Sequence, residues 1–211
     1  MQPDEQFDTR LGFAEAAILA GGASRRMGQD KTLLPIGNRS LIEIVAAQLT
    51  SLFHRVRIIA NEEEKFADLN LPIQPDIRPG CGPLGGIHSA LATAQQDTVF
   101  VAGCDFPFLT TSFIKGLAEL LGTNDVVLPR YLDRPVAVCA FYSIRCLPAI
   151  EASLDREAYR AVSFFKDVKV RWVQGDELMK LDPNGLALTN LNTPEDYLQA
   201  KQSIERQDKS G

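Results

Sequence analysis

The chain has 211 residues, 45% of them hydrophobic and 23% charged, which is typical of a globular protein with a core of its own. Its net charge of −5 argues against nonspecific binding to nucleic acids, because such binding depends on neutralising phosphates with lysine and arginine. No apolar stretch approaches the length that crosses a bilayer, and the acidic N-terminus does not resemble a signal peptide, so we expect no membrane association.

The most informative pattern lies near the N-terminus. Residues 1–12 are polar and are expected to be flexible, and residues 14–19 are predicted to form a buried strand. Residues 19–31 then read Leu-Ala-Gly-Gly-Ala-Ser-Arg-Arg-Met-Gly-Gln-Asp-Lys. Glycines allow backbone amides to approach a ligand closely, and the two arginines and Lys31 add positive charge to the same loop. This combination predicts a binding loop for a polyphosphate.

Two familiar phosphate-binding loops do not fit this segment. A Walker A loop has four residues between its glycines and then Lys-Ser/Thr, whereas Gly22 and Gly28 have five residues between them and Gln29 follows. A dinucleotide-binding fingerprint needs Gly-x-Gly-x-x-Gly, which the adjacent Gly21 and Gly22 do not provide. The alternative interpretation is a flexible glycine loop with solvated arginines.

The following elements alternate between helix and strand. The capping-box pattern Ser40-Leu-Ile-Glu43 predicts a helix over residues 41–53. Expected next are a strand at 55–60, a short acidic helix or turn at 62–69 and a short strand at 71–75. The segment 78–86 is too rich in glycine and proline for regular structure, and a helix is predicted from about residue 84 to 94. The most strand-like run is 98–102.

The second part of the chain is expected to extend the same sheet. The patterns predict a helix at 111–121, strands at 125–129, 136–141 and 169–174, and helices at 145–154 and 158–166. A last helix would open at Thr193-Pro194, with Thr193 as its N-cap. Strand–helix alternation up to about residue 120 indicates an α/β protein with a largely parallel sheet. We expect a single domain over residues 13–211, with a nucleotide half at about 13–122 and an acceptor half at about 123–211.

Polar residues follow several predicted strands, where ligands of parallel sheets gather. Asp105 follows a buried strand, and its carboxylate could hold Mg²⁺ against phosphate oxygens or serve as a turn or N-cap residue. Asp76 could be a second metal-side carboxylate, an acceptor for a base or ribose, or a turn residue. Asn61 could read a base edge or cap the helix at 62–69.

The predicted chemistry is transfer at phosphorus without a covalent intermediate. Ser24 lies beside arginines with no histidine near it, and the four cysteines are scattered, so no activated nucleophile is evident. Lys31 and the loop amides would hold the phosphates, while Mg²⁺ on Asp105 would offset charge on the transferring group and the leaving pyrophosphate. The cysteines form no Cys-x-x-Cys pair, so we expect no zinc site and no disulfide framework, and a cytoplasmic location.

With these residues in view, the sequence resembles the molybdenum cofactor guanylyltransferases (MobA type) among the nucleotidyltransferases. Four stretches carry the resemblance: residues 19–31, Gly82-Pro83-Leu84-Gly85-Gly86, Cys104-Asp105-Phe106-Pro107 and Asn190-Leu-Asn-Thr-Pro-Glu195. The first indicates a nucleotidyltransferase, and its combination with the last indicates the molybdopterin branch. The resemblance implies a three-layer α/β/α, Rossmann-like nucleotidyltransferase fold. It also implies transfer of GMP from GTP to the phosphate of molybdenum-molybdopterin, giving molybdopterin guanine dinucleotide and pyrophosphate.

The resemblance also assigns roles to individual residues. The catalytic residues would be Lys31, Asp105 and Arg26, with Mg²⁺ on Asp105. The contacts to GTP would be Leu19, Ala20, Gly21, Gly22, Lys31, Asn61, Asp76 and Asp105. The molybdopterin would lie toward Arg134, Asn190 and Asn192. Arg134 stands where many members of the family have histidine, and an arginine also suits an acceptor that bears a phosphate.

Two other functions stay open at this point. A nucleotidyltransferase of the same fold could use CTP, or a sugar phosphate as acceptor, because the first loop is shared among such enzymes. A nucleotide-binding protein that has lost turnover could keep the fold, although the presence of Lys31 and Asp105 argues against it. Other cofactor-biosynthesis enzymes, or the enzymes that accept the cofactor, are possible protein partners.

Overall fold

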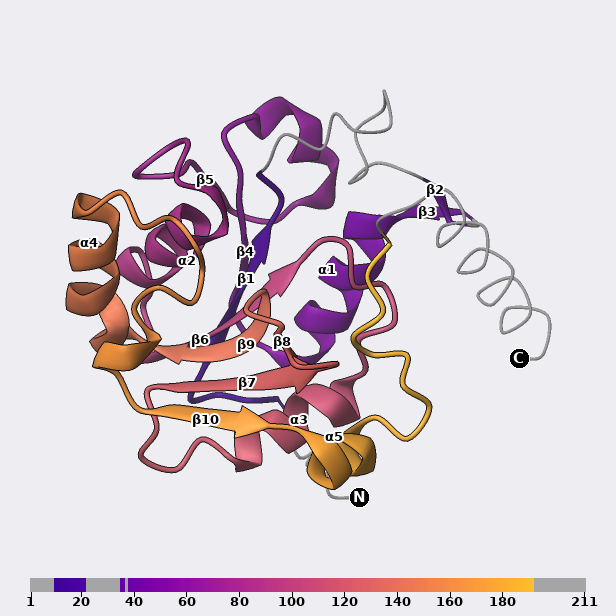
Figure 1. Ribbon diagram of the computed structural model, residues 1–211. Helices are drawn as coiled ribbons and strands as arrows, with labels where there is room; N and C mark the ends of the chain where they lie inside the picture. The colour runs from indigo at the N-terminus through magenta and orange to yellow at the C-terminus, as the bar shows by residue number, and fades with distance from the viewer. Residues whose placement is uncertain (1–9, 22–34, 37, 192–211) are drawn as a thin grey trace, which may run out of the picture.

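The computed structural model describes residues 10–21, 35–36 and 38–191, in which a β-sheet lies between two layers of helices (Figure 1). The strands of the main sheet are β1 (Glu15–Leu19), β4 (Val56–Ile59), β5 (Ile73–Gln74), β6 (Thr98–Gly103), β7 (Val126–Tyr131), β8 (Arg134–Pro135), β9 (Cys139–Ser143) and β10 (Val170–Val173). Their order is β10-β7-β9-β6-β1-β4-β5, with β8 paired to β7. Along this path only β9 is antiparallel to its neighbours. The predicted α/β class with a mostly parallel sheet is therefore confirmed.

The helices are divided between the two faces of the sheet. They are α1 (Leu41–Leu52), α2 (Gly82–Ala92), α3 (Thr111–Glu119), α4 (Leu147–Asp155) and α5 (Gly175–Leu181), with 3₁₀ turns η3 (Glu63–Leu69), η4 (Ile144–Cys146) and η5 (Phe165–Asp167). Buried side chains of α1, α3 and α5 share one hydrophobic cluster with Ala16 and Ile18 of β1. Those of α2 and α4 share another with Ala17 and Leu19. Successive residues of β1 thus face opposite layers, as a strand covered on both faces requires.

The helix α1 begins as its sequence predicts. The Ser40 amide donates to Glu43 Oε2 at 2.5 Å and the Glu43 amide donates to Ser40 Oγ at 3.4 Å, which completes the capping box. The bonds from the Ser40 amide and hydroxyl lower the pKa of Glu43. Before this helix, the short strands β2 (Pro35–Ile36) and β3 (Arg39–Ser40) form a separate two-stranded sheet.

Glu15 is the one charged residue within β1, and it is fully buried. Its Oε1 accepts hydrogen bonds from Arg57 Nη1 at 2.6 Å and from the Gln95 amide at 3.1 Å. Arg57 Nη2 also donates to the Ala90 carbonyl at 2.5 Å. A buried charge is tolerated where it is paired and hydrogen-bonded, so this ion pair explains how the strand accommodates Glu15.

Several sequence predictions in the second half are wrong in detail. Residues 158–166 do not form the predicted helix, because Ser163 Oγ donates to the carbonyls of Ala158 and Arg160 and so competes with backbone bonds. Glu157, at φ 59°, lies in a separate turn directly after α4. Arg134 and Pro135 were expected in a loop, but they form β8 in a hairpin closed by Leu132 and Asp133, both at positive φ.

Other boundaries differ by a few residues. The strand expected at 136–141 is β9, which begins at Cys139, and the helix expected from about residue 84 begins at Gly82 with Pro83 in its first turn. The helix α5 was not predicted. The helix expected to open at Thr193, and most of residues 1–12, lie outside the described residues. Within the described parts of the chain, no helix is long and apolar enough to cross a bilayer.

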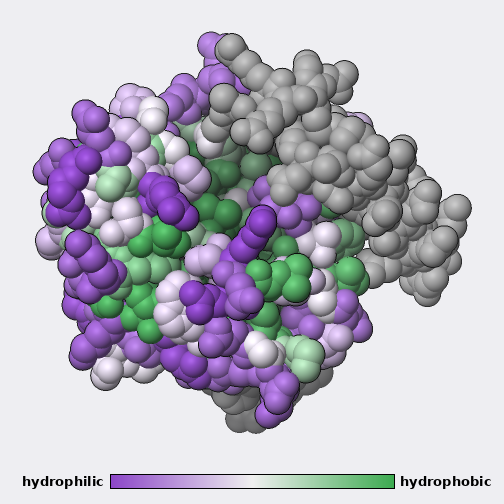
Figure 2. Space-filling model, in the orientation of Figure 1, coloured by the Kyte–Doolittle hydropathy of each residue, from purple (hydrophilic) through white to green (hydrophobic). Residues whose placement is uncertain are grey.

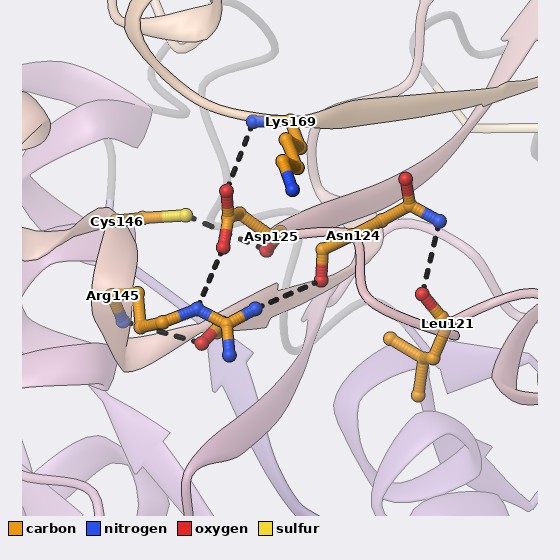
Figure 3. Close-up of polar contacts among 7 residues, drawn as sticks. Leu121, Asn124, Asp125, Arg145, Cys146 and Lys169 are labelled. Carbon is orange, nitrogen blue, oxygen red and sulfur yellow. Dashed lines mark hydrogen bonds and ion pairs between the residues drawn. The ribbon is translucent and has the colours of Figure 1, made fainter.

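Asp125 ties together the amino-terminal ends of β7 and β10 and the start of α4 (Figure 3). Its carboxylate accepts from the Lys169 amide at 2.9 Å and from Arg145 Nε at 2.8 Å. Cys146 Sγ donates to the backbone carbonyl of Asp125 at 3.5 Å. Burial alone would raise the pKa of Asp125, but the Lys169 amide and the Arg145 guanidinium lower it below its ordinary value of 3.8.

We expect Asp125→Ala to lower the free energy of unfolding by about 1–3 kcal/mol, because charge-assisted hydrogen bonds to two elements are lost. Since the folded-state pKa is lowered, the wild-type carboxylate stabilises the fold above pH 4 and loses this contribution as the pH falls through the folded pKa. Urea unfolding at pH 7 and at pH 3 measures both effects. Replacement of the exposed Glu119 by alanine serves as the control. If the free energies of unfolding of wild type and Asp125→Ala differed by the same amount at pH 7 and at pH 3, the assigned role of the carboxylate would be contradicted.

Candidate functional site

The candidate site lies at the carboxyl ends of the central parallel strands (Figure 1). Leu19, the last residue of β1, is in register with Ile59 of β4 on one side and Gly103 of β6 on the other. The Ala20 amide donates to the Ile59 carbonyl at 3.1 Å and so continues the pairing one residue beyond β1. The chain that enters the glycine-rich segment therefore leaves from the middle of the sheet, between the strands that precede Asn61 and Asp105.

Asn61 and Asp76 meet beside the start of this segment. The Asp76 amide donates to Asn61 Oδ1 at 2.9 Å. A Cβ placed on Gly21 would lie 3.7 Å from Asp76 Oδ2 and 3.8 Å from the Ile59 carbonyl oxygen. The N-cap of η3 is Glu62 and has no side-chain capping bond, so the alternative role of Asn61 as an N-cap is wrong. Asn61 instead fixes the backbone of Asp76.

Asp76 is a half-buried carboxylate with an unsatisfied oxygen. Its Oδ1 is buried and has no hydrogen-bond partner among the described residues. Burial raises the pKa of Asp76, and hydrogen bonds with Ser89 and Asn61 oppose that shift only in part. Ser89 Oγ also accepts from the Ile77 amide at 2.9 Å, which holds the chain after Asp76 against α2. Buried polar atoms normally have partners, so this oxygen is suited to accept a hydrogen bond from a ligand.

The Gly82-Pro83-Leu84-Gly85-Gly86 motif forms the first turn and a half of α2 and packs against the end of β1. A Cβ on Gly86 would come within 3.1 Å of Leu19 Cδ1, and a Cβ on Gly85 within 2.9 Å of the Arg78 carbonyl oxygen. The motif thus lets α2 approach both the end of β1 and the chain that follows Asp76. Its glycines serve close packing beside the site.

Asp105 lies on the other side of β1, just beyond β6. Its Oδ1 folds back over the end of the strand, where a Cβ on Gly103 would lie only 2.6 Å away. The Leu191 amide donates to the Asp105 backbone carbonyl at 3.1 Å, so the segment that carries Asn190 is bound to the backbone of Asp105. The helix α3 is capped by Thr110, whose Oγ1 accepts from the Phe113 amide at 3.2 Å, and an N-cap role for Asp105 is therefore wrong.

The carboxylate of Asp105 fits a magnesium ion that is bound partly by substrate. In the described residues no group of three or more His, Cys, Asp or Glu side chains could hold a metal alone. Mg²⁺ commonly uses one or two carboxylates together with substrate phosphates and water, and a half-buried carboxylate at the strand end provides one such ligand.

A groove of about 560 Å³ lies between α2, the β8–β9 connection and the segment after α4. It is lined by Pro83, Pro135, Ala137, Tyr159, Arg160, Ala161 and Val162. Hydrophobic surface crosses the middle of this face between hydrophilic rims (Figure 2). Arg134 is exposed on the hairpin next to Pro135. The sequence analysis did not identify Tyr159 and Arg160 as groove residues. It placed both in a predicted helix at 158–166, where nothing in the sequence indicated that they line a groove.

The structure thus brings Leu19, Ala20, Gly21, Asn61, Asp76 and Asp105 to one edge of the sheet, with Asn190 on the segment beside Asp105. Gly22, Arg26, Lys31 and Asn192 lie outside the described residues. An open, mostly parallel sheet with a glycine and carboxylates at its carboxyl edge defines an α/β protein of the nucleotide-binding class.

Comparison with known proteins identifies the family. The model of the MobA-like NTP transferase domain matches residues 16–170, so this chain belongs to the MobA-like nucleotidyltransferases. The "Probable molybdenum cofactor guanylyltransferase" of Pelotomaculum thermopropionicum is 38% identical over 188 residues, which cover 89% of this chain and 92% of the relative. The "Molybdenum cofactor guanylyltransferase" of Syntrophotalea carbinolica is 33% identical over 189 residues, which cover 89% of this chain and 90% of the relative.

A solved structure has the same fold. "Molybdopterin-guanine dinucleotide biosynthesis protein A" from Archaeoglobus fulgidus superposes with a TM-score of 0.79 at 24% identity, over 91% of this chain and 99% of that protein. The expected three-layer nucleotidyltransferase fold is therefore confirmed. The chain is an enzyme of this class, as the sequence predicted.

We expect Asp76→Asn to weaken nucleotide binding without lowering the stability of the free protein. Because burial raises the folded-state pKa of Asp76, ionisation of this group disfavours folding, and that cost grows as the pH rises through the folded pKa. The neutral asparagine removes it. Thermal unfolding at pH 8 should give a melting temperature at or above that of wild type, whereas the stabilisation produced by GTP should fall. A variant that melts lower without nucleotide yet keeps the full GTP shift would contradict this role.

We expect Gly86→Ala to impair nucleotide binding through Leu19, because the added methyl group would press on Leu19 Cδ1 from 3.1 Å. The affinity for GTP, measured by isothermal titration calorimetry, should fall by about tenfold, or about 1.4 kcal/mol. Gly12→Ala is the matched control, since a Cβ there meets nothing within 4 Å. Equal affinities for the two variants would show that the approach of α2 to Leu19 does not matter for binding.

Proposed function

We propose that this nucleotidyltransferase transfers GMP from GTP to the phosphate of molybdenum-molybdopterin and releases pyrophosphate. The names of its relatives, at up to 38% identity across most of both chains, support the substrates. The observation that carries the proposal is the joint position of Asp76 and Asp105. They lie at one sheet edge, on the two sides of the strand that opens into the cationic glycine segment.

In this proposal the donor nucleotide lies across the end of β1. Asp76 Oδ1 accepts a hydrogen bond from the base or the ribose, which supplies a partner that this oxygen does not have among the described residues. Asn61, whose Oδ1 accepts from the Asp76 amide, contacts the same nucleoside from beside Asp76. Leu19, Ala20, Gly21 and Gly22 contribute backbone along the nucleotide, and Arg26 and Lys31 contact the phosphates.

The reaction is a displacement at the α-phosphorus. An oxygen of the acceptor's phosphate attacks, a new P–O bond forms, and the bond to the pyrophosphate leaving group breaks. Lys31 and Arg26 neutralise the charge that develops on the leaving group, and the backbone of the glycine segment holds the phosphates in line. Mg²⁺, held by Asp105 and by phosphate oxygens, would supply further charge neutralisation at the same atoms.

The acceptor is placed in the groove of Pro83, Pro135, Tyr159 and Arg160. Its volume of about 560 Å³ is within the range of small-molecule sites, and its lining combines apolar surface with an arginine. Arg134, on the hairpin that bears Pro135, offers a second guanidinium for a phosphate. Asn190 and Asn192 would approach the acceptor from the Asp105 side, since Leu191 bonds to Asp105.

Three further points belong to the proposal. Residues 13–211 form one domain with a nucleotide half and an acceptor half, which the sheet shared by both halves supports. The protein acts in the cytoplasm, which the four free cysteines support. Enzymes of cofactor biosynthesis, or enzymes that accept the finished cofactor, are its protein partners.

Pyrophosphate release tests the reaction. With Mg²⁺ and molybdenum-loaded molybdopterin, GTP should support turnover, and ATP and CTP should do so at least about tenfold more slowly. Lys31→Ala and Asp105→Ala should each lower kcat by about 10²–10³-fold with folding retained, because each removes charge stabilisation from the transition state. Glu119→Ala, on the exposed side of α3, is the control.

Each part of the proposal has an outcome that would overturn it. Stronger turnover or stronger thermal protection with CTP would point to a cytidylyltransferase. GTP binding without turnover would point to a nucleotide-binding protein. Unchanged turnover of Asp105→Ala in the presence of Mg²⁺ would remove Asp105 from its proposed role.

A further inference from the structure

Two ion pairs join the region of α2 to α4. Arg78 Nη1 lies 2.5 Å from Asp155 Oδ1, and His88 Nε2 lies 3.4 Å from Glu151 Oε1. Arg78 lies in the segment between Asp76 and α2, and Asp155 is the last residue of α4. The first pair therefore links the nucleotide half of the chain to the acceptor half.

The two partners of this pair lie next to opposite walls of the groove. After Arg78 the chain passes Gly80 at φ 82° and Gly82 at φ 58°, conformations that favour glycine, and reaches Pro83 on one wall. After Asp155 it turns at Glu157 and supplies Tyr159 and Arg160 on the other wall. The Ala158 amide donates to the Ser153 carbonyl at 2.9 Å, so this second wall is anchored to α4 itself.

Tyr159 and Pro83 line the same groove, so the segment after α4 and the segment after Arg78 meet there. The side chains of Arg78 and Asp155 remain 38% and 63% exposed, and exposed pairs of this kind contribute little to global stability.

We propose that Arg78 and Asp155 are positioning residues that set the relative placement of the two groove walls, and through it the affinity for the acceptor. The identity of the acceptor rests on the proposed function, but the linkage between the walls does not. Neither residue lines the groove, so the pair acts through Pro83, Tyr159 and Arg160.

Charge reversal and charge exchange test the pair. Arg78→Asp and Asp155→Arg should each raise the KM for molybdenum-molybdopterin by about five- to tenfold, with kcat and the thermal shift by GTP within about twofold of wild type. The double variant with the charges exchanged should return to within about twofold of the wild-type KM. Hydrogen–deuterium exchange of residues 156–163 should quicken in both single variants and recover in the double variant.

The Arg171–Glu177 pair provides a matched control. Its 2.5 Å separation and exposures of 39% and 36% resemble those of Arg78–Asp155, but it joins β10 to α5 and does not line the groove. Arg171→Asp should leave both the acceptor KM and the exchange of residues 156–163 unchanged.

The outcomes separate this inference from the proposed function. Single variants with wild-type exchange and KM, or a double variant that fails to recover, would overturn the positioning role. A wild-type protein that releases no pyrophosphate with GTP and molybdenum-molybdopterin would overturn the proposed function. In that case the exchange measurements on the same four proteins still decide whether Arg78 and Asp155 hold the walls together.

Discussion

Because β1 is paired on both edges and covered on both faces, its polar neighbours can gather only at its two ends. At the amino end, the buried carboxylate of Glu15 forms an ion pair with Arg57, which compensates its charge in the core. At the carboxyl end, the chain emerges as Ala20-Gly21, flanked by the strands that precede Asn61 and Asp105. The position of the candidate site follows from this one constraint, since every functional group at that edge is placed relative to the end of β1.

The two sides of that edge are built differently. On the Asp76 side, Asn61 and Ser89 hold the backbone around a carboxylate that remains partly unsatisfied, and burial raises its pKa. In the proposed function this group gains a hydrogen bond when the nucleotide binds, so the site would trade some stability of the free protein for binding. On the Asp105 side, the carboxylate lies over a glycine and beside the segment that carries Asn190. The donor and acceptor sides of a transfer reaction can therefore meet at one strand end.

The second half of the chain adds a groove without adding a separate core. Its strands β7, β9 and β10 continue the same sheet, and Asp125 joins two of its strands to the start of α4 by hydrogen bonds at their amino ends. The groove then forms where α2, the hairpin of β7 and β8, and the turn after α4 come together. These three segments are far apart in sequence, and the Arg78–Asp155 contact is a polar link between the region of α2 and α4.

The sequence by itself determined the elements whose signals are local. The apolar runs before Leu19 and at Thr98, the capping box at Ser40 and the threonine cap at Thr110 all encode their own secondary structure, and the positions of Asn61, Asp76 and Asp105 follow from the ends of parallel strands. Only the tertiary structure decided the rest. The turn at Ser163 replaces a predicted helix because side-chain bonds compete with the backbone, and Tyr159 and Arg160 become groove residues because α4 carries them opposite Pro83. Contacts between segments distant in sequence leave no periodic signal, and so the gathering of these residues at one edge of the sheet was predictable whereas the groove wall was not.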